Sequence, residues 1–348
     1  MSYSKAEIIC TDNPALRVMV QKRLDNLTKP QGSLGRLEDI VMQYCLARNS
    51  AEAKITKRKC FVFAADHGIT AEGVAPYPRE VTVQMVLNML SGGAAISVMC
   101  RNSGVECQIV NMGVDGDFAP HPSLIIRSVA AGTRNFRHEA AMSEEECRKA
   151  LDSGYQLGIN ADADICATGE MGIGNSSSAS ALYSLLLGTE AGLTVGRGTG
   201  AEGSVLEKKH RVITESVSFH SKQWDGTPFD ALRRVGGFEI AGMTGFIIGC
   251  AVKRIPVIID GFIVSVSALC ALRMHPDIKS NLFWGHTSNE QFHKMALDSI
   301  QARPILNLDM RLGEGTGAIL AMNIIEQALN CYHQMASFTS AGVSNRVD

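Results

Sequence analysis

The sequence of 348 residues lacks the short motifs that mark several common enzyme classes. It has no Walker A sequence, which argues against a P-loop nucleoside triphosphatase, and no G-x-S-x-G element of the kind found in α/β-hydrolases. It also has no H-E-x-x-H pair, and none of its histidines has a second ligand at a metal-binding spacing. The sequence therefore predicts no metal site, and its chemistry has to be sought in other features.

Neither the charged residues nor the cysteines are clustered in a pattern that indicates a particular function. The formal net charge is −2, with acidic and basic residues mixed along the chain, so no basic face for nucleic acid and no polybasic membrane patch is expected. The ten cysteines are scattered without a C-x-x-C pair, which predicts reduced and mostly buried thiols in a cytoplasmic protein. The N-terminus has no signal-peptide apolar core, and the most apolar tract, residues 238–272, is interrupted by charged residues and proline. That tract is expected to form a buried helix, strand and helix rather than a membrane span.

What the sequence does contain is a series of short apolar runs that alternate with helical patterns. The expected strands are residues 61–65, 105–110, 163–167, 256–259, 281–284 and 305–309. Residues 116–140 are expected to be irregular, and Ser143 with Glu146 has the spacing of a capping box at the start of a helix. This alternation predicts an α/β fold with a doubly wound, mostly parallel sheet, whose ligands bind at the carboxyl ends of the strands.

A glycine-rich loop follows the expected strand at residues 163–167. Its order, Gly169-x-x-Gly172-x-Gly174, differs from the dinucleotide fingerprint, and Asn175 and three serines follow it at the start of a helix. Amide and hydroxyl donors at a helix start favour an anion or ribose site, although a tight turn is the simpler alternative. Asp66 and His67 end another strand, where a structural or substrate-contacting role is expected rather than metal binding.

Glu314 lies between Gly313 and Gly315, directly before a long apolar-faced helix. It is either an acidic residue that suits the positive end of a helix, or a general base; the local pattern alone leaves both open. Lys209 follows a second glycine-rich loop at residues 196–200, and it is a solvated charge unless a phosphate binds nearby.

These segments together resemble the nicotinate-nucleotide–dimethylbenzimidazole phosphoribosyltransferase family, which makes the lower nucleotide of cobamides. The matching segments run in the family order over nearly the whole chain. They are KPQGSLGRLE (29–38), ADHGI (65–69), GEMGIGNSS (169–177), GRGTG (196–200), LRRVGGFEIAGMTG (232–245), IDGF (259–262) and MRLGEGTGA (310–318).

The resemblance implies a Rossmann-like sheet with helices on both faces in a large domain, residues 59–324. It also implies a small helical domain made of residues 1–58 and 325–348, and a dimer. The expected reaction moves phosphoribosyl from nicotinate mononucleotide to an aromatic base with inversion, giving an α-ribotide and nicotinate, without cofactor or metal. Glu314 falls on the family's general base. The implied nucleotide contacts are Glu170, Gly172, Asn175, Ser176, Ser177, Lys209, Gly313 and Gly315.

The base pocket departs from the family pattern. Tyr77 and Met85 align where relatives that use dimethylbenzimidazole usually have Ser and Gln. Either this is an ordinary substitution, or the pocket is less polar and suits a base with fewer nitrogens, such as phenol or p-cresol. The alternatives to a homodimeric transferase of this family are one subunit of a heterodimer of paralogues, and a nucleotide hydrolase in which water replaces the base.

Overall fold

The computed structural model describes residues 3–8 and 13–344. Its described strands form one parallel sheet in the order β3-β2-β1-β4-β5-β6. The strands are β1 (Arg58–Ala65), β2 (Glu106–Gly113), β3 (Leu124–Ile126), β4 (Ile165–Met171), β5 (Val257–Ile259) and β6 (Leu282–Trp284). The expected α/β class with a parallel sheet is confirmed.

Helices occupy most of the remaining chain. The first part contains α1 (Pro14–Asp25), α2 (Arg36–Arg48), α3 (Val81–Leu90), α4 (Ala95–Asn102), α5 (Glu144–Ile159), α6 (Asn175–Leu187) and α7 (Ala191–Thr194). The second part contains α8 (Gly203–Ser221), α9 (Pro228–Val235), α10 (Phe238–Val252), α11 (Phe262–Met274), α12 (His293–Ser299), α13 (Thr316–Gln334) and α14 (Phe338–Ala341). Short 3-10 turns are η1 (Tyr3–Lys5), η2 (Gly68–Glu72) and η3 (Pro276–Asn281).

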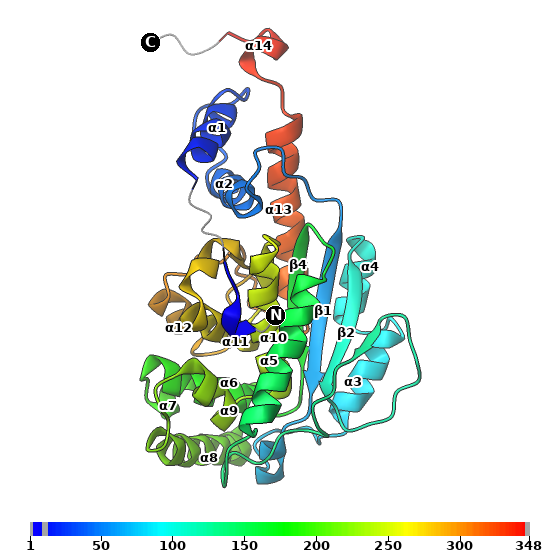
Figure 1. Cartoon of the computed structure of the whole chain (residues 1–348), viewed down its shortest axis with the longest axis vertical. Helices are drawn as coiled ribbons and strands as arrows, with labels where there is room; N and C mark the ends of the chain where they lie inside the picture. Colours follow the sequence, from blue (N-terminus) through cyan, green and yellow to red (C-terminus); the bar gives the residue numbers. More distant parts are fainter. Residues whose placement is uncertain (1–2, 9–12, 345–348) are drawn as a thin grey trace.

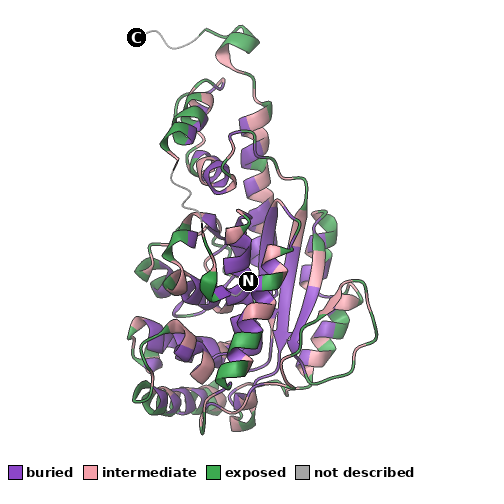
Figure 2. Ribbon diagram, in the orientation of Figure 1, coloured by how far each residue is buried: buried purple, intermediate pink, exposed green. Residues whose placement is uncertain are grey.

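Helices cover both faces of the sheet because alternate residues of a buried strand point to opposite sides. On β1, Phe61 and Phe63 pack against Phe246 of α10, with ring centroids 4.7 and 5.5 Å apart. Val62, between them, belongs to the other core cluster, which includes Met322 of α13. Figure 2 shows the resulting buried strands between helices whose outer sides are exposed.

Two expectations about strands are wrong, and one helix was missed. Residues 305–309 form only a single bridge, between Leu306 and His286, and the left-handed backbone of Asp309 (φ 55°) ends the extended run. The expected irregular segment contains the short edge strand β3, and α9 occupies residues that were expected to form part of a turn. The capping box of α5 is confirmed, since the hydroxyl of Ser143 accepts from the Glu146 amide at 3.1 Å.

The helices near the two chain ends lie together. Figure 1 shows α1 and α2 beside the part of α13 that extends beyond the sheet. The core cluster there is continuous with one sheet face, since it joins Leu16 of α1 and Tyr332 of α13 to Val62 of β1. The boundary of a separate small domain therefore remains a prediction. Among the described residues, only Val81–Asn102 has the length and composition of a membrane-crossing helix, but a turn divides it into α3 and α4, and one such stretch is weak evidence for a span.

Candidate active site

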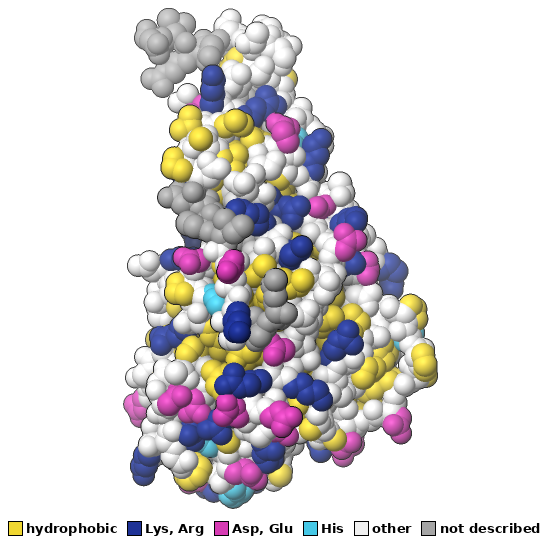
Figure 3. Space-filling view, viewed as in Figure 1, with side chains coloured by type: hydrophobic (Ala, Val, Ile, Leu, Met, Phe, Trp, Pro, Cys, Tyr) yellow, Lys and Arg dark blue, Asp and Glu magenta, His cyan; other side chains and the backbone are white. Residues whose placement is uncertain are grey.

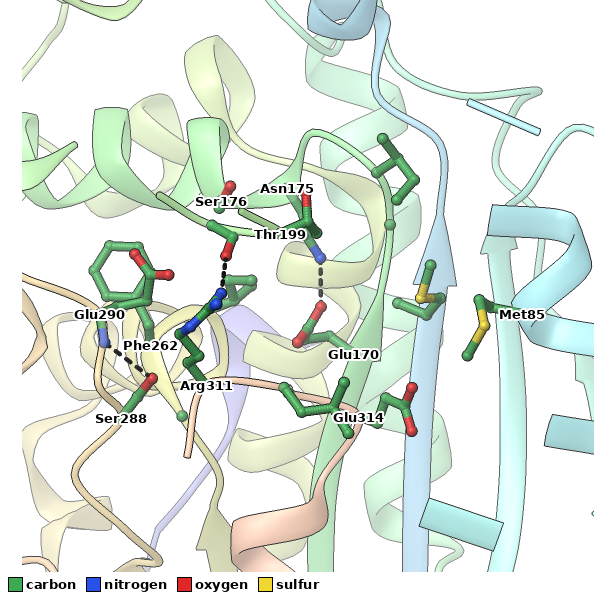
Figure 4. A pocket seen from close by; sticks show the side chains of 18 of the residues that line it. Met85, Glu170, Asn175, Ser176, Thr199, Phe262, Ser288, Glu290, Arg311 and Glu314 are labelled. Atoms are coloured by element: carbon green, nitrogen blue, oxygen red, sulfur yellow. Dashed lines mark hydrogen bonds between the residues drawn. The ribbon is translucent and has the colours of Figure 1, made fainter. Parts of the chain in front are cut away.

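The carboxyl ends of β4, β5 and β6 open into a cleft of ≈ 660 Å³. Its size is typical of a site for a small molecule. Most of the predicted site residues line it: Tyr77, Met85, Glu170, Gly172, Asn175, Ser176, Gly313 and Glu314. Figure 4 shows Met85 and Glu314 toward one end, Ser176, Thr199 and Arg311 toward the other, and Glu170 with Asn175 between them.

Ser177, Lys209 and Gly315 do not line the cleft. Lys209 is 1% exposed, and its Nζ donates to Ser176 Oγ at 2.9 Å and to the Gly196 carbonyl at 3.0 Å. Burial lowers the pKa of Lys209 to about 8, and the negative charge of Glu290 acts in the opposite direction. Lys209 therefore supports the polar end of the cleft from behind Ser176, with a positive charge directed at the start of α6.

Glu170 is the buried acid in the middle of the cleft. Its carboxylate accepts a hydrogen bond from the side-chain amide of Asn175, the first residue of α6. Burial raises the pKa of Glu170 to about 8, and this hydrogen bond opposes the shift only in part. The nearby carboxylates of Asp260, Glu239 and Glu314 raise the pKa further. Glu170 is therefore mostly protonated at neutral pH, and in that form it is a hydrogen-bond donor rather than a base.

Glu314 is held on a left-handed stretch of backbone. Gly313, Glu314 and Gly315 have φ of 83°, 62° and 96°, so one non-glycine residue stands in a conformation that favours glycine. The Oε2 atom of Glu314 accepts from the Ile96 amide in α4 at 3.3 Å. Burial raises the pKa of Glu314, and the Ile96 hydrogen bond opposes the shift. A carboxylate with a raised pKa is better suited to take up a proton near neutral pH.

Two residues fix the position of this loop. Asp260, at the end of β5, accepts hydrogen bonds from the amides of Gly315 at 3.2 Å and Ala318 at 2.9 Å. Gly169 of β4 lies against the loop, because a Cβ atom at that position would be 2.1 Å from the Glu314 carbonyl oxygen. Gly169 therefore allows the Glu314 loop to pack closely against β4, and it also begins the glycine-rich loop that follows this strand.

Asp66 and His67 contact protein groups. The ring nitrogens of His67 lie 3.1 Å from Ser178 Oγ and 2.7 Å from Glu239 Oε1, with both the His67 and Glu239 side chains fully buried. Asp66 accepts from the Asp115 amide at 2.8 Å. His67 therefore connects the end of β1 to the first turn of α6, behind the cleft.

Several lining residues were not predicted from the sequence. They are Val81, Met171, Ile173, Gly198, Thr199, Gly261, Phe262, Ile263, Ser288, Glu290, Arg311 and Leu312. Arg311 donates from Nη1 to the Gly198 carbonyl at 3.1 Å, and so joins two of the glycine-rich segments. Both residues lie inside glycine-rich segments that the sequence had already indicated as parts of a site, so they could have been predicted as site residues. Glu290 lies beyond β6 in no recognisable motif, and only the fold brings it to the cleft.

The sequence and fold were compared with known proteins. Residues 9–343 match a family model described as "Phosphoribosyltransferase". A relative from Chlorobaculum tepidum, named nicotinate-nucleotide–dimethylbenzimidazole phosphoribosyltransferase, is 48% identical, with 94% of each chain covered. A relative of the same name from a Geobacter species is 45% identical, with 95% of each chain covered. The crystal structure of CobT from Thermus thermophilus is 38% identical with a TM-score of 0.91, covering 96% of this chain and 100% of that one.

A parallel α/β sheet with this cleft, in a chain that matches the family model along nearly its whole length, defines a phosphoribosyltransferase, an enzyme that transfers a pentosyl group. More narrowly, the chain belongs to the nicotinate-nucleotide–dimethylbenzimidazole phosphoribosyltransferase family. The predicted family and enzyme class are confirmed.

Proposed function

We propose that this enzyme transfers phosphoribosyl from nicotinate mononucleotide to an aromatic lower-ligand base, releasing nicotinate and forming an α-ribotide with inversion, as a step in cobamide synthesis. The observation that carries this proposal is the position of Glu314. Its buried carboxyl lines the same cleft as the Asn175–Ser176 helix start, with Glu170 between them (Figure 4). A base and a phosphoribosyl group can therefore bind side by side.

The 5′-phosphate is assigned to the start of α6. Amides at a helix N-terminus and the hydroxyl of Ser176 are donors for an anion, and Lys209 directly behind Ser176 adds a positive charge. Protonated Glu170 is assigned to donate to a ribose hydroxyl. Gly172 and Gly313 allow close packing beside it, because a Cβ atom would lie 2.5 Å from the Ala65 carbonyl oxygen at Gly172 and 2.2 Å from Glu170 Oε1 at Gly313. Ser177 and Gly315, which lie outside the cleft lining, are assigned to the support of these two loops.

In the reaction, a ring nitrogen of the incoming base attacks C1′ while the bond from C1′ to the nicotinate nitrogen breaks. Nicotinate leaves readily because its ring nitrogen is cationic in the nucleotide, and it departs with the bonding electron pair. Glu314 takes the proton that the attacking base loses. Attack opposite to the leaving group inverts the anomeric carbon, which requires both rings to be held in line.

Glu314→Gln tests this assignment. Glutamine keeps the shape and an acceptor for the Ile96 amide but cannot take up a proton, so kcat for transfer should fall ~10²–10⁴-fold. The KM for nicotinate mononucleotide should change little. Exposed Glu190→Gln is the matched control and should be as active as the parent. If Glu314→Gln keeps more than a tenth of the parental kcat, Glu314 is not the general base.

Hydrolysis is the competing reaction at such a site. If water replaced the base, nicotinate would be released equally fast with and without an aromatic acceptor. We expect release to depend on the acceptor, because the cleft lining includes Met85 and Val81, which favour an apolar ring over water. Chromatographic assay of nicotinate release, with dimethylbenzimidazole present or omitted, separates transferase from hydrolase.

The acceptor is assigned to the wall formed by Tyr77 and Met85. Met85 is partly buried and offers a thioether in place of an amide, and Tyr77 is 52% exposed at the cleft margin. We infer a pocket that accepts benzimidazoles and also phenolic rings, in which the hydroxyl oxygen attacks C1′. Kinetics with dimethylbenzimidazole, adenine, phenol and p-cresol test this, and a strict preference for dimethylbenzimidazole would contradict it.

We further propose a cytoplasmic homodimer, with a heterodimer of paralogues as the alternative. Exposed apolar side chains on α1, including Val18 and Met19, support a protein contact there (Figure 3). Light scattering of the purified chain distinguishes the two. A stable active dimer of this chain alone supports the homodimer, whereas a monomer that becomes active only with a second chain supports the heterodimer.

A further inference from the structure

Three cysteines from two separate segments of the chain meet on one face of the sheet. Cys60 lies on β1 and Cys107 lies opposite it on β2, where the two are direct partners in the parallel register. Cys100 comes from the last turn of α4, the helix that leads into β2. The three Sγ atoms all lie within 4.8 Å of one another. No C-x-x-C spacing announces this cluster, because the strand pairing creates it.

The spacing suits a thiophilic metal ion. Thiolates bind Zn²⁺ at ~2.3 Å, which places the sulfur atoms of a tetrahedral site about 3.8 Å apart, so the cluster needs little rearrangement. Cys60 and Cys100 are buried, whereas Cys107 is partly exposed and gives an ion access from solvent. Three protein ligands leave a fourth position for water, as in open zinc sites.

We propose that Cys60, Cys100 and Cys107 form a three-thiolate site for a soft divalent cation of the Zn²⁺ class. Thiolate sulfur selects soft ions over Mg²⁺ and Ca²⁺. The complex of a divalent ion with three thiolates has a net charge of −1, whereas the complex of a monovalent ion such as Cu(I) has a net charge of −2. Burial of the additional charge is costly, so the divalent ion is favoured in this largely apolar position.

The site adjoins the loop of Glu314 but is separate from the cleft. A Cβ atom on Gly315 would lie 3.3 Å from Cys60 Sγ, and Ile96, whose amide binds Glu314, is one helical turn before Cys100 in α4. The metal site is inferred from the thiol geometry alone, so it does not depend on the proposed reaction.

Cobalt titration of the reduced full-length protein tests the site, because thiolate ligation of Co²⁺ gives a charge-transfer absorption band. The band should saturate at one equivalent, and Zn²⁺ should remove it. Cys107→Ser, at the partly exposed position, should weaken Co²⁺ binding at least ~10-fold and reduce the band. Cys331→Ser, also partly exposed, and Cys250→Ser, which removes a buried thiol on the opposite sheet face, are matched controls that should bind like the parent.

X-ray absorption of the Zn²⁺-loaded parent protein gives an independent readout that needs no variant. Three sulfur neighbours per zinc support the proposal, and two or fewer refute it. Equal Co²⁺ affinity in Cys107→Ser and the parent, or the absence of a saturable band in the parent, also refutes it. Circular dichroism of each variant establishes that it is folded before the titrations are compared.

Discussion

Replacing Glu170 by glutamine should make the protein more stable at alkaline pH. Burial raises the pKa of this carboxyl from 4.5 to about 8, so the folded protein retains a proton that the unfolded chain releases. The stability that this protonated group contributes is fully present below pH ~4.5 and is lost as the pH rises toward 8. Glutamine mimics the protonated form at every pH and should remove this loss.

The size of the effect follows from the shift. The difference between 4.5 and about 8, at ~1.4 kcal/mol per pH unit, sets an upper limit of ~5 kcal/mol above pH 8. Glu170 lines an open cleft, and water that solvates the ionised carboxylate reduces the penalty. We therefore expect Glu170→Gln to gain ~2–4 kcal/mol over the parent between pH 5 and pH 8.5.

Urea unfolding at pH 5, 6.5 and 8.5 measures this difference directly. The variant and parent should diverge as the pH rises, while exposed Glu190→Gln should follow the parent throughout. Parallel curves for Glu170→Gln and the parent, within about 1 kcal/mol, would refute the argument, since they would mean that Glu170 ionises alike in the folded and unfolded chains.

Three other variants probe the supports of the cleft. Gly169→Ala places a Cβ atom 2.1 Å from the Glu314 carbonyl oxygen and should lower kcat ~10²-fold by displacing the Glu314 loop. Gly192→Ala, whose Cβ atom meets nothing closer than 3.9 Å, is the control and should keep the parental kcat. Equal kcat values for the two variants would contradict this packing. Lys209→Met should raise the KM for nicotinate mononucleotide ~10–100-fold in steady-state assays with kcat nearly unchanged, because the charged bond from Nζ to Ser176 Oγ, worth ~1.5–3 kcal/mol, holds that hydroxyl at the proposed phosphate site. An unchanged KM would mean that Lys209 does not support phosphate binding. Glu314→Gly should be ~1 kcal/mol more stable to urea than Glu314→Ala, since only glycine is unstrained at φ 62°, and the reverse order would mean that the loop is unstrained.

Strands could be predicted from the sequence where an apolar run has its side chains buried on both faces of the sheet. Val257–Ile259 and the later part of β1 are short, apolar and followed by polar residues, as expected of central parallel strands. Residues 305–309 share this composition, yet they only extend the edge of the sheet beyond β6. The Ile305 amide donates to the Trp284 carbonyl at 2.9 Å, and the chain turns away at Asp309. Composition does not reveal how far a neighbouring strand continues.

Residues of the site could be predicted only where they lie in loops with a recognisable sequence pattern. Glycines beside Asn175 and Glu314 predicted a ligand site at these two loops, and both residues line the cleft. The strand order was not encoded in any local pattern. It places β4 between β1 and β5, with Asp260 after β5 beside the Glu314 loop. It also pairs β1 with β2, which brings Cys60 to Cys107. Contacts of this kind depend on pairing between distant segments, so the sequence pattern gave no indication of them.

The backbone at Glu314 connects these observations. Three consecutive residues have positive φ, and the outer two are glycines, which adopt that conformation without strain. Glu314 lacks that freedom, and a left-handed non-glycine residue costs ~1–2 kcal/mol. Its carboxyl is also buried, which raises its pKa and adds to the cost. A third glycine would avoid both penalties and still allow Asp260 to accept from the Gly315 amide. The hydrogen bond from the Ile96 amide to the Glu314 carboxyl, at 3.3 Å, offsets part of this cost. A non-glycine residue kept in a strained, buried position beside a cleft motivates the hypothesis of a role in chemistry there rather than at the helix start.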